Sequence, residues 1–143
     1  MRLRRVASFG LAALLLASCG GLGPREAPRG ALMATFDHGA DRVLPPEAPP
    51  PISPEGYTEL RYLGLAGSSA ILLQTSHAPD PAATDPAPEL PRVSTSVAVD
   101  LGRVEADGFE TRRGAVVVRR HRVELEDVRP EAVRYRVRPA GGA

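Results

Sequence analysis

The sequence of 143 residues contains no lysine, no tryptophan and a single cysteine, Cys19. One cysteine cannot form an intramolecular disulfide, and it cannot build a zinc site from thiolates alone. Aromatic residues account for only 4% of the chain and form no cluster typical of a sugar-stacking platform. All 18 basic residues are arginines, and a GC-rich genome explains this bias together with the abundant Ala, Pro and Gly.

The first 18 residues predict an export signal. Three arginines within Met1–Arg5 precede an uncharged, largely apolar run from Val6 to Leu16, and small residues follow. A basic start, a short apolar run and small residues at the cleavage point define a secretory signal peptide. The alternative is a transmembrane helix, which needs about 20 apolar residues, but Gly20 and Gly21 end this run early.

Leu16-Ala17-Ser18-Cys19 resembles the lipobox of bacterial lipoproteins at all four positions. The resemblance implies cleavage between Ser18 and Cys19 and attachment of diacylglycerol to the Cys19 thiol, with a further acyl chain on the new amino group. Two or more acyl chains hold a protein stably in a bilayer. Gly20 follows in place of the aspartate that retains many such lipoproteins at the inner membrane. We therefore expect a lipid-anchored protein of the cell envelope, at the outer membrane facing the periplasm if the host has two membranes.

Composition divides the rest of the chain into a tether and a domain. Residues 19–56 are rich in proline and glycine, with six prolines between Pro45 and Pro54. Such runs favour extended polyproline II, so 19–56 is predicted to be a flexible tether that starts at the acylated cysteine. Residues 31–36 are its one apolar island, and they are compatible with a short strand that docks on the domain. Residues 57–139 are predicted to form a small β domain with a proline-rich loop at 77–91, and residues 140–143 a disordered tail.

The apolar pattern of the domain predicts antiparallel strands. Residues 57–65 and 70–76 flank a Gly-Ser turn and predict a hairpin. Residues 93–101 alternate between apolar and polar side chains, as a half-buried strand does, and residues 133–138 place valine and tyrosine opposite arginine. The fold class is therefore all-β: a small antiparallel sheet, open barrel or sandwich of five or six strands.

Three smaller signals interrupt the strands after residue 102. Asp107-Gly108 and Arg113-Gly114 predict turns. The apolar runs on either side of Arg120 and His121 are out of phase, which predicts a bulge or bend between them.

No residue pattern predicts catalysis, a metal site or a cofactor. The G-x-S-x-G motif of serine hydrolases and the phosphate-binding glycine motifs are absent from the sequence. Carboxylates spaced by two, such as Glu105/Asp107 and Glu124/Glu126, are equally expected on a solvated strand face. Two histidines have carboxylates near them in sequence: His38 beside Asp37 and Asp41 in the predicted tether, and His77 near Asp80 and Asp85 in the predicted loop.

A basic face is the strongest remaining signal. The precursor has a formal net charge of +1, yet residues 103–143 alone hold 10 arginines against 7 acidic residues. Alternate residues of a strand project from one face about 7 Å apart, and guanidinium groups suit phosphate and carboxylate. The predicted face consists of Arg134, Arg136 and Arg138, with Arg120 and Arg122, next to Arg119, on a neighbouring strand. Alternatively, Glu124, Glu126 and Glu131 pair with these arginines across strands and leave a solvated face.

Two functions of different class are compatible with these features. The first is a non-enzymatic contact or assembly module, held to the bilayer through acylated Cys19. Its partner would be an envelope protein or an anionic cell-wall or lipid headgroup, and we expect no nucleic acid because the chain is exported. The second is a small lipid-anchored ligand- or metal-binding module, or a hydrolase, centred on the 77–91 loop.

Overall fold

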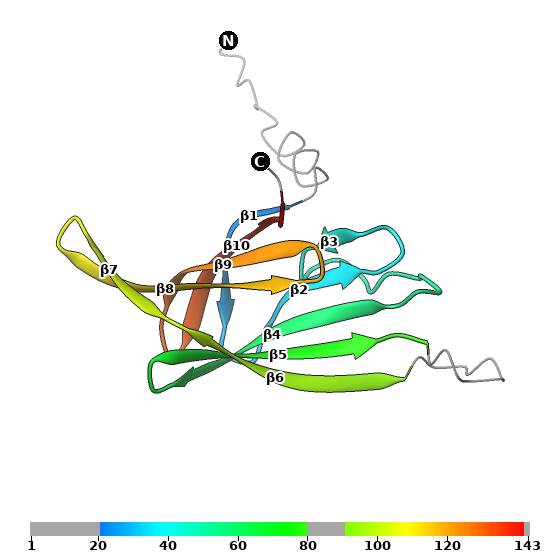
Figure 1. Ribbon diagram of the computed structural model, residues 1–143, viewed down its shortest axis with the longest axis horizontal. Helices are drawn as coiled ribbons and strands as arrows, with labels where there is room; N and C mark the ends of the chain where they lie inside the picture. The colour runs from blue at the N-terminus through cyan, green and yellow to red at the C-terminus, as the bar shows by residue number, and fades with distance from the viewer. Residues whose placement is uncertain (1–20, 80–90, 142–143) are drawn as a thin grey trace, which may run out of the picture.

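The computed structural model of the protein describes residues 21–79 and 91–141, which form ten β-strands in two antiparallel sheets (Figure 1). The predicted signal peptide and Cys19 lie outside the described residues, as do residues 80–90 of the predicted loop and the last two residues. The prediction of an all-β fold is confirmed. The described residues hold ten strands, however, in place of the five or six expected.

The first sheet has the strand order β1-β10-β9-β8-β7, so the N- and C-terminal strands are neighbours. Its members are β1 (Leu22–Pro28), β7 (Gly102–Ala106), β8 (Phe109–Val118), β9 (His121–Val128) and β10 (Ala132–Pro139). The second sheet has the order β3-β2-β4-β5-β6. Its members are β2 (Leu32–Asp37), β3 (Arg42–Leu44), β4 (Tyr57–Ala66), β5 (Ser69–His77) and β6 (Arg92–Asp100).

Period-two alternation in the sequence builds the strands that carry the core. On β10, Val133, Tyr135 and Val137 are buried, while Arg134 and Arg138 point to solvent. The predicted 57–65/70–76 hairpin is confirmed as β4–β5, which pair from Tyr57–His77 to Ala66–Ser69. The buried side chains of both sheets form one hydrophobic cluster, so the two sheets pack face to face in a sandwich-like arrangement.

Two tyrosine hydroxyls cross this core from one sheet to the other. Tyr135 on β10 donates a hydrogen bond to the backbone carbonyl of Met33 on β2. In the opposite direction, Tyr62 on β4 donates to the carbonyl of Arg129, which follows β9. Burial raises the pKa of Tyr135 to about 12 and also raises the pKa of Tyr62. Both phenols therefore stay protonated and keep their donor role.

The predicted tether over residues 19–56 is wrong for residues 22–44. These residues supply β1, β2 and β3, and Met33, Ala34 and Phe36 are among the most deeply buried side chains. The following proline-rich stretch is also attached to the sheets, because Glu47 lies 2.6 Å from Arg25 of β1. The domain thus begins with β1, and Tyr57 is an internal position rather than its start.

The apolar runs on either side of Arg120 and His121 are out of phase, but a bulge is not the reason. Val118 and His121 pair directly across a two-residue turn, so the two out-of-phase runs are two separate strands, β8 and β9. Arg119 has a φ of 54° in this turn, the left-handed conformation that tight hairpins require. The predicted turn at Arg113-Gly114 is wrong, because both residues lie inside β8.

Gly114 serves close packing. A Cβ atom there would lie 2.9 Å from the carbonyl oxygen of Asp100 and 3.0 Å from side-chain atoms of Leu101 and Val99. Glycine is needed where one backbone approaches another this closely. At this crossing the chain passes from β6 of the second sheet to β7 of the first, and β7 and β8 continue beyond the sandwich as a projecting hairpin (Figure 1).

We predict that Tyr135→Phe lowers the free energy of unfolding by about 1–2 kcal/mol, because it leaves the buried Met33 carbonyl without its donor. Urea unfolding of the full chain, followed by far-UV circular dichroism, measures the loss. Tyr57→Phe is the matched control, since Tyr57 is only half-buried and packs on His77 outside the core. An equal loss in both variants would contradict the role assigned to the Tyr135 hydroxyl.

Candidate functional site

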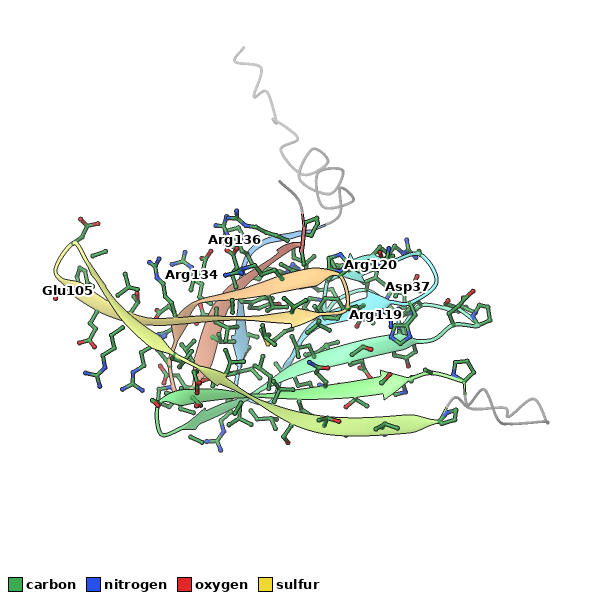
Figure 2. All side chains as sticks on the ribbon, viewed as in Figure 1. Asp37, Glu105, Arg119, Arg120, Arg134 and Arg136 are labelled. Atoms are coloured by element: carbon green, nitrogen blue, oxygen red, sulfur yellow. The ribbon has the colours of Figure 1, made fainter. Side chains whose placement is uncertain are left out.

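The predicted arginine face lies on the outer surface of the first sheet. Val123 and Leu125 of β9 point into the core, so Arg122, Glu124 and Glu126 point outward. In the register of β9 and β10, Arg136 lies opposite Glu124 and Arg138 lies opposite Arg122. Figure 2 shows Arg134 and Arg136 on this sheet, while Arg119 and Arg120 lie toward the end that carries Asp37.

An open groove of about 610 Å³ runs over β8, β9 and β10 on this outer surface. On β8 the groove passes over Ala115, whose small side chain lies on the outer face beside Arg113. Four arginines and two glutamates line it, which gives the lining a formal charge of +2. The lining residues are Arg113, Gly114, Ala115, Arg122, Glu124, Leu125, Glu126, Arg136 and Arg138.

The glutamates partly neutralise the arginines. Glu124 lies between two of them, 3.6 Å from Arg122 Nε and 3.6 Å from Arg138 Nε. Arg136 Nε lies 2.6 Å from Glu126 Oε1, although its N–H makes no well-directed hydrogen bond to a described residue. The long pairs of Arg122 and Arg138 are more than half exposed on the arginine side, and such ion pairs contribute little to stability, about 0–1 kcal/mol each. The guanidinium groups of Arg122 and Arg138 therefore remain available to an anion that enters the groove.

The structure brings together only part of the predicted arginine set. Arg122, Arg136 and Arg138 line the groove, whereas Arg120 faces Asp41 in the β2–β3 connection at 3.4 Å. Arg134 lies on the same sheet outside the groove lining and has no ion pair with a described residue. Glu131 pairs with Arg129 at 3.6 Å, away from the groove. Of the five predicted arginines, Arg122, Arg136 and Arg138 thus line one groove, while Arg120 and Arg134 lie outside its lining.

Arg113 is a groove residue that the sequence reasoning missed. The glycine that follows it predicts a turn, but Arg113 lies on β8 with Nε 3.2 Å from the hydroxyl of Thr111. The alternation Arg113, Ala115, Val117 against Gly114, Val116, Val118 was the available signal for a strand. It was hidden because glycine and alanine take two of the six positions.

His38 is held by two hydrogen bonds and belongs to a folded connection. Nδ1 lies 3.1 Å from the carbonyl oxygen of Glu55, and Nε2 lies 2.7 Å from the Thr58 hydroxyl. A carbonyl can only accept, so neutral His38 donates from Nδ1 and accepts from Thr58 at Nε2. Its neighbour Asp37 accepts from Gly39 N at 3.1 Å and Arg42 Nε at 3.3 Å. These groups satisfy one another and do not converge on a cation.

His77 meets an acidic side chain, as a site on the 77–91 loop would require. Its Nε2 lies 2.7 Å from Glu59 Oε1, and its ring stacks on Tyr57 with centroids 4.4 Å apart. Nearby, the hydroxyls of Thr75 and Ser94 lie 3.1 Å apart and bond to each other. Asp80 and Asp85, which were predicted to join His77, lie outside the described residues.

Within residues 21–79 and 91–141, no group of three or more His, Cys, Asp or Glu side chains could hold a metal ion. The same residues include no helix long and apolar enough to cross a membrane. The carboxylate pair Glu105/Asp107 lies at the projecting β7–β8 hairpin, where β7 is exposed along its whole length.

Comparisons of the chain with protein families, characterised proteins and solved structures found no match.

We predict that His38 makes stability depend on pH. Burial and, second, the charge of Arg119 lower the pKa of His38 below its ordinary value of 6.5. The unfolded chain then binds more protons between the lowered pKa and 6.5, so the folded state loses stability as the pH falls through this window. His38→Gln removes that loss. Urea unfolding from about pH 7.5 to about pH 5 should therefore show a smaller decrease for the variant than for the unchanged chain, and equal decreases would contradict the assignment.

Proposed function

We propose that the protein is a lipid-anchored contact module of the bacterial cell envelope that binds an anionic partner group in the groove over β8–β10. The lipobox-like sequence before Cys19 supports the anchor. The observation that carries the contact role is the groove itself, in which Arg113, Arg122, Arg136 and Arg138 line one open surface. The partner would be an envelope protein, or a cell-wall or lipid headgroup, that presents carboxylate or phosphate.

The chemistry of the groove favours binding over catalysis. Guanidinium groups stay protonated at all physiological pH values and cannot act as general acids or bases. They present several N–H donors in a plane, which matches the paired oxygens of carboxylate and phosphate. None of the groove-lining residues is a histidine, cysteine, serine or threonine. Apart from the carboxylates of Glu124 and Glu126, which face the arginines, the groove presents only guanidinium groups and apolar atoms, so it is suited to the recognition of an anion.

The paired glutamates set the strength of such binding. An incoming anion competes with Glu124 for Arg122 and Arg138, which lie 3.6 Å from it on either side. These are long pairs at the protein surface. Dissolved salt weakens the attraction between surface charges, with a screening length of about 10 Å at about 0.1 M. We therefore expect contact that is reversible and weakens with ionic strength, as suits a module that is already concentrated at a membrane by its anchor.

We predict that Arg122→Gln/Arg138→Gln abolishes capture of the partner while leaving the fold intact, because the two changes remove half of the groove's guanidinium groups and only exposed ion pairs. The measurement is a cross-linked pull-down of the C-terminally tagged full chain from solubilised envelopes. Arg61→Gln/Arg92→Gln is the control with the same change in charge on the second sheet. Retention of the partner by the groove variant, or its loss in both variants, would contradict the proposal.

We predict that the mature chain carries acyl groups on Cys19. The intact mass of protein purified from the membrane fraction should equal residues 19–143 plus diacylglycerol, with or without a further acyl chain. Cys19→Ala should show no added lipid mass and should leave the membrane fraction. An unmodified mass at Cys19 in the unchanged protein would overturn the anchor.

A further inference from the structure

The outer edge of β7 is an open strand edge. β7 is the last strand on one side of the first sheet, and among the described strands it pairs only with β8. All five of its residues, Gly102–Ala106, are exposed. Figure 2 shows Glu105 far out on the projecting hairpin, away from the side chains of the sandwich. An edge of this kind presents unpaired backbone N–H and C=O groups that another strand can bond.

The charges on this hairpin are arranged unfavourably within one chain. Arg103 lies opposite Arg112, and Glu105 lies opposite Glu110. Like charges directly across a strand pair are destabilising. One diagonal ion pair, from Arg103 Nε to Glu110 Oε1 at 3.2 Å, relieves part of this repulsion. Glu105 has no ion-pair partner in the part of the chain that the structure describes.

The turn determines which backbone groups of β7 face outward. Asp107 and Gly108 form a two-residue turn with φ values of 54° and 79°, the pattern of a type I′ hairpin closed by a hydrogen-bonded pair. That closing pair is Ala106–Phe109. Because the pairs of an antiparallel ladder alternate, the N–H and C=O groups of Arg103 and Glu105 point away from β8. These two residues thus carry the free hydrogen-bonding groups of the edge.

We propose that two copies of the chain pair antiparallel through β7, about a two-fold axis at Val104. In this register Arg103 lies opposite Glu105 of the partner subunit, and the symmetry repeats the pair on the other side of the axis. Each pair exchanges both of its outward N–H···O=C bonds. The same pairing places opposite charges side by side, so the backbone and the charges specify one arrangement together.

Neighbouring registers are excluded by the same residues. An axis at Arg103 would place two arginines opposite each other, and an axis at Glu105 would do so for two glutamates. With the axis between two residues, Arg103 would lie opposite Val104 of the partner subunit. The backbone groups of Val104 point toward its own β8, so the outward groups of Arg103 would find no partner. Two antiparallel copies of Arg103-Val104-Glu105 place opposite charges against each other only when the axis passes through Val104.

The apolar face of the hairpin also gains from this pairing. Val104 is 38% exposed and Phe109 is 74% exposed. At the axis, the two Val104 side chains meet in a non-hydrogen-bonded pair, where side chains lie closest. Phe109 flanks Ala106, and in this register Gly102 of the partner subunit lies next to Ala106. The small residues leave space for the phenylalanine ring, so two exposed apolar groups become covered.

The experiment is disulfide trapping of the full chain in the cells that make it. Val104→Cys should yield a cross-linked homodimer on non-reducing gels after mild oxidation, because the paired Cα atoms would be about 4.5 Å apart, within reach of a disulfide. Ala106→Cys is the matched control, since its Cα atoms would be about 13 Å apart along the strands. The unchanged chain, with Cys19 alone, gives the baseline. No dimer at 104, equal dimer at 106, or a cross-link at 104 to a different protein would overturn the proposal.

Charge exchange in the Val104→Cys background separates pairing from folding. Arg103→Glu should lower the cross-linked fraction roughly tenfold, because glutamate then faces Glu105 of the partner subunit on both sides of the axis. The hairpin itself should persist, since residue 103 would then oppose Arg112 with the opposite charge. Arg103→Glu/Glu105→Arg should restore the cross-link by reversing both signs. An unchanged cross-link in the single variant, or no recovery in the double variant, would refute the register.

Discussion

The hydrogen bonds that the Tyr62 and Tyr135 hydroxyls donate across the core set the relation between the two sheets. The Tyr135 hydroxyl of the first sheet bonds to the Met33 carbonyl on β2 of the second, and the Tyr62 hydroxyl of the second sheet bonds to the Arg129 carbonyl between β9 and β10 of the first. Hydrophobic packing alone is non-directional, whereas a buried hydroxyl needs its acceptor at a defined place. The pair therefore adds a directional constraint on how the sheets face each other, while the buried apolar residues of each strand decide which of its sides is turned inward.

Because the inward side is fixed, the outward side follows from the two-residue period of the strands. Tyr135 points inward, so Arg134 and Arg136 point outward, and register with β9 then places Glu124 beside Arg136. β8 completes the surface with Arg113, while Gly114 beneath it allows β6 to cross at close range. The charged groove is thus a consequence of core packing, since the same alternation that buries valine and tyrosine aligns the arginines.

The sequence allowed the all-β class, the β4–β5 hairpin and the inward residues of β10 to be predicted, because each has a clear period of two. The apolar residues 31–36 indicate a short docking strand, but not the place of β2 between β3 and β4 inside a sheet. From Met33 to Asp37, β2 is buried at every position, and a strand buried on both faces has no alternation. Arg113 was missed because glycine inside a strand resembles a turn. The groove required long-range register between β8, β9 and β10, which no local pattern encodes.

On the projecting hairpin, the charged residues of the β7 edge have an unusual effect on association with other strands. Charged residues on an edge strand usually prevent association, because an approaching strand must desolvate them. On β7, however, one positive and one negative residue flank Val104 symmetrically, so the antiparallel strand that best satisfies them is another β7. The same charges that reject most strands therefore select a copy of this one. Within one hairpin Arg103 lies opposite Arg112 and Glu105 opposite Glu110, and the opposite charges that a second β7 brings beside Arg103 and Glu105 offset this repulsion.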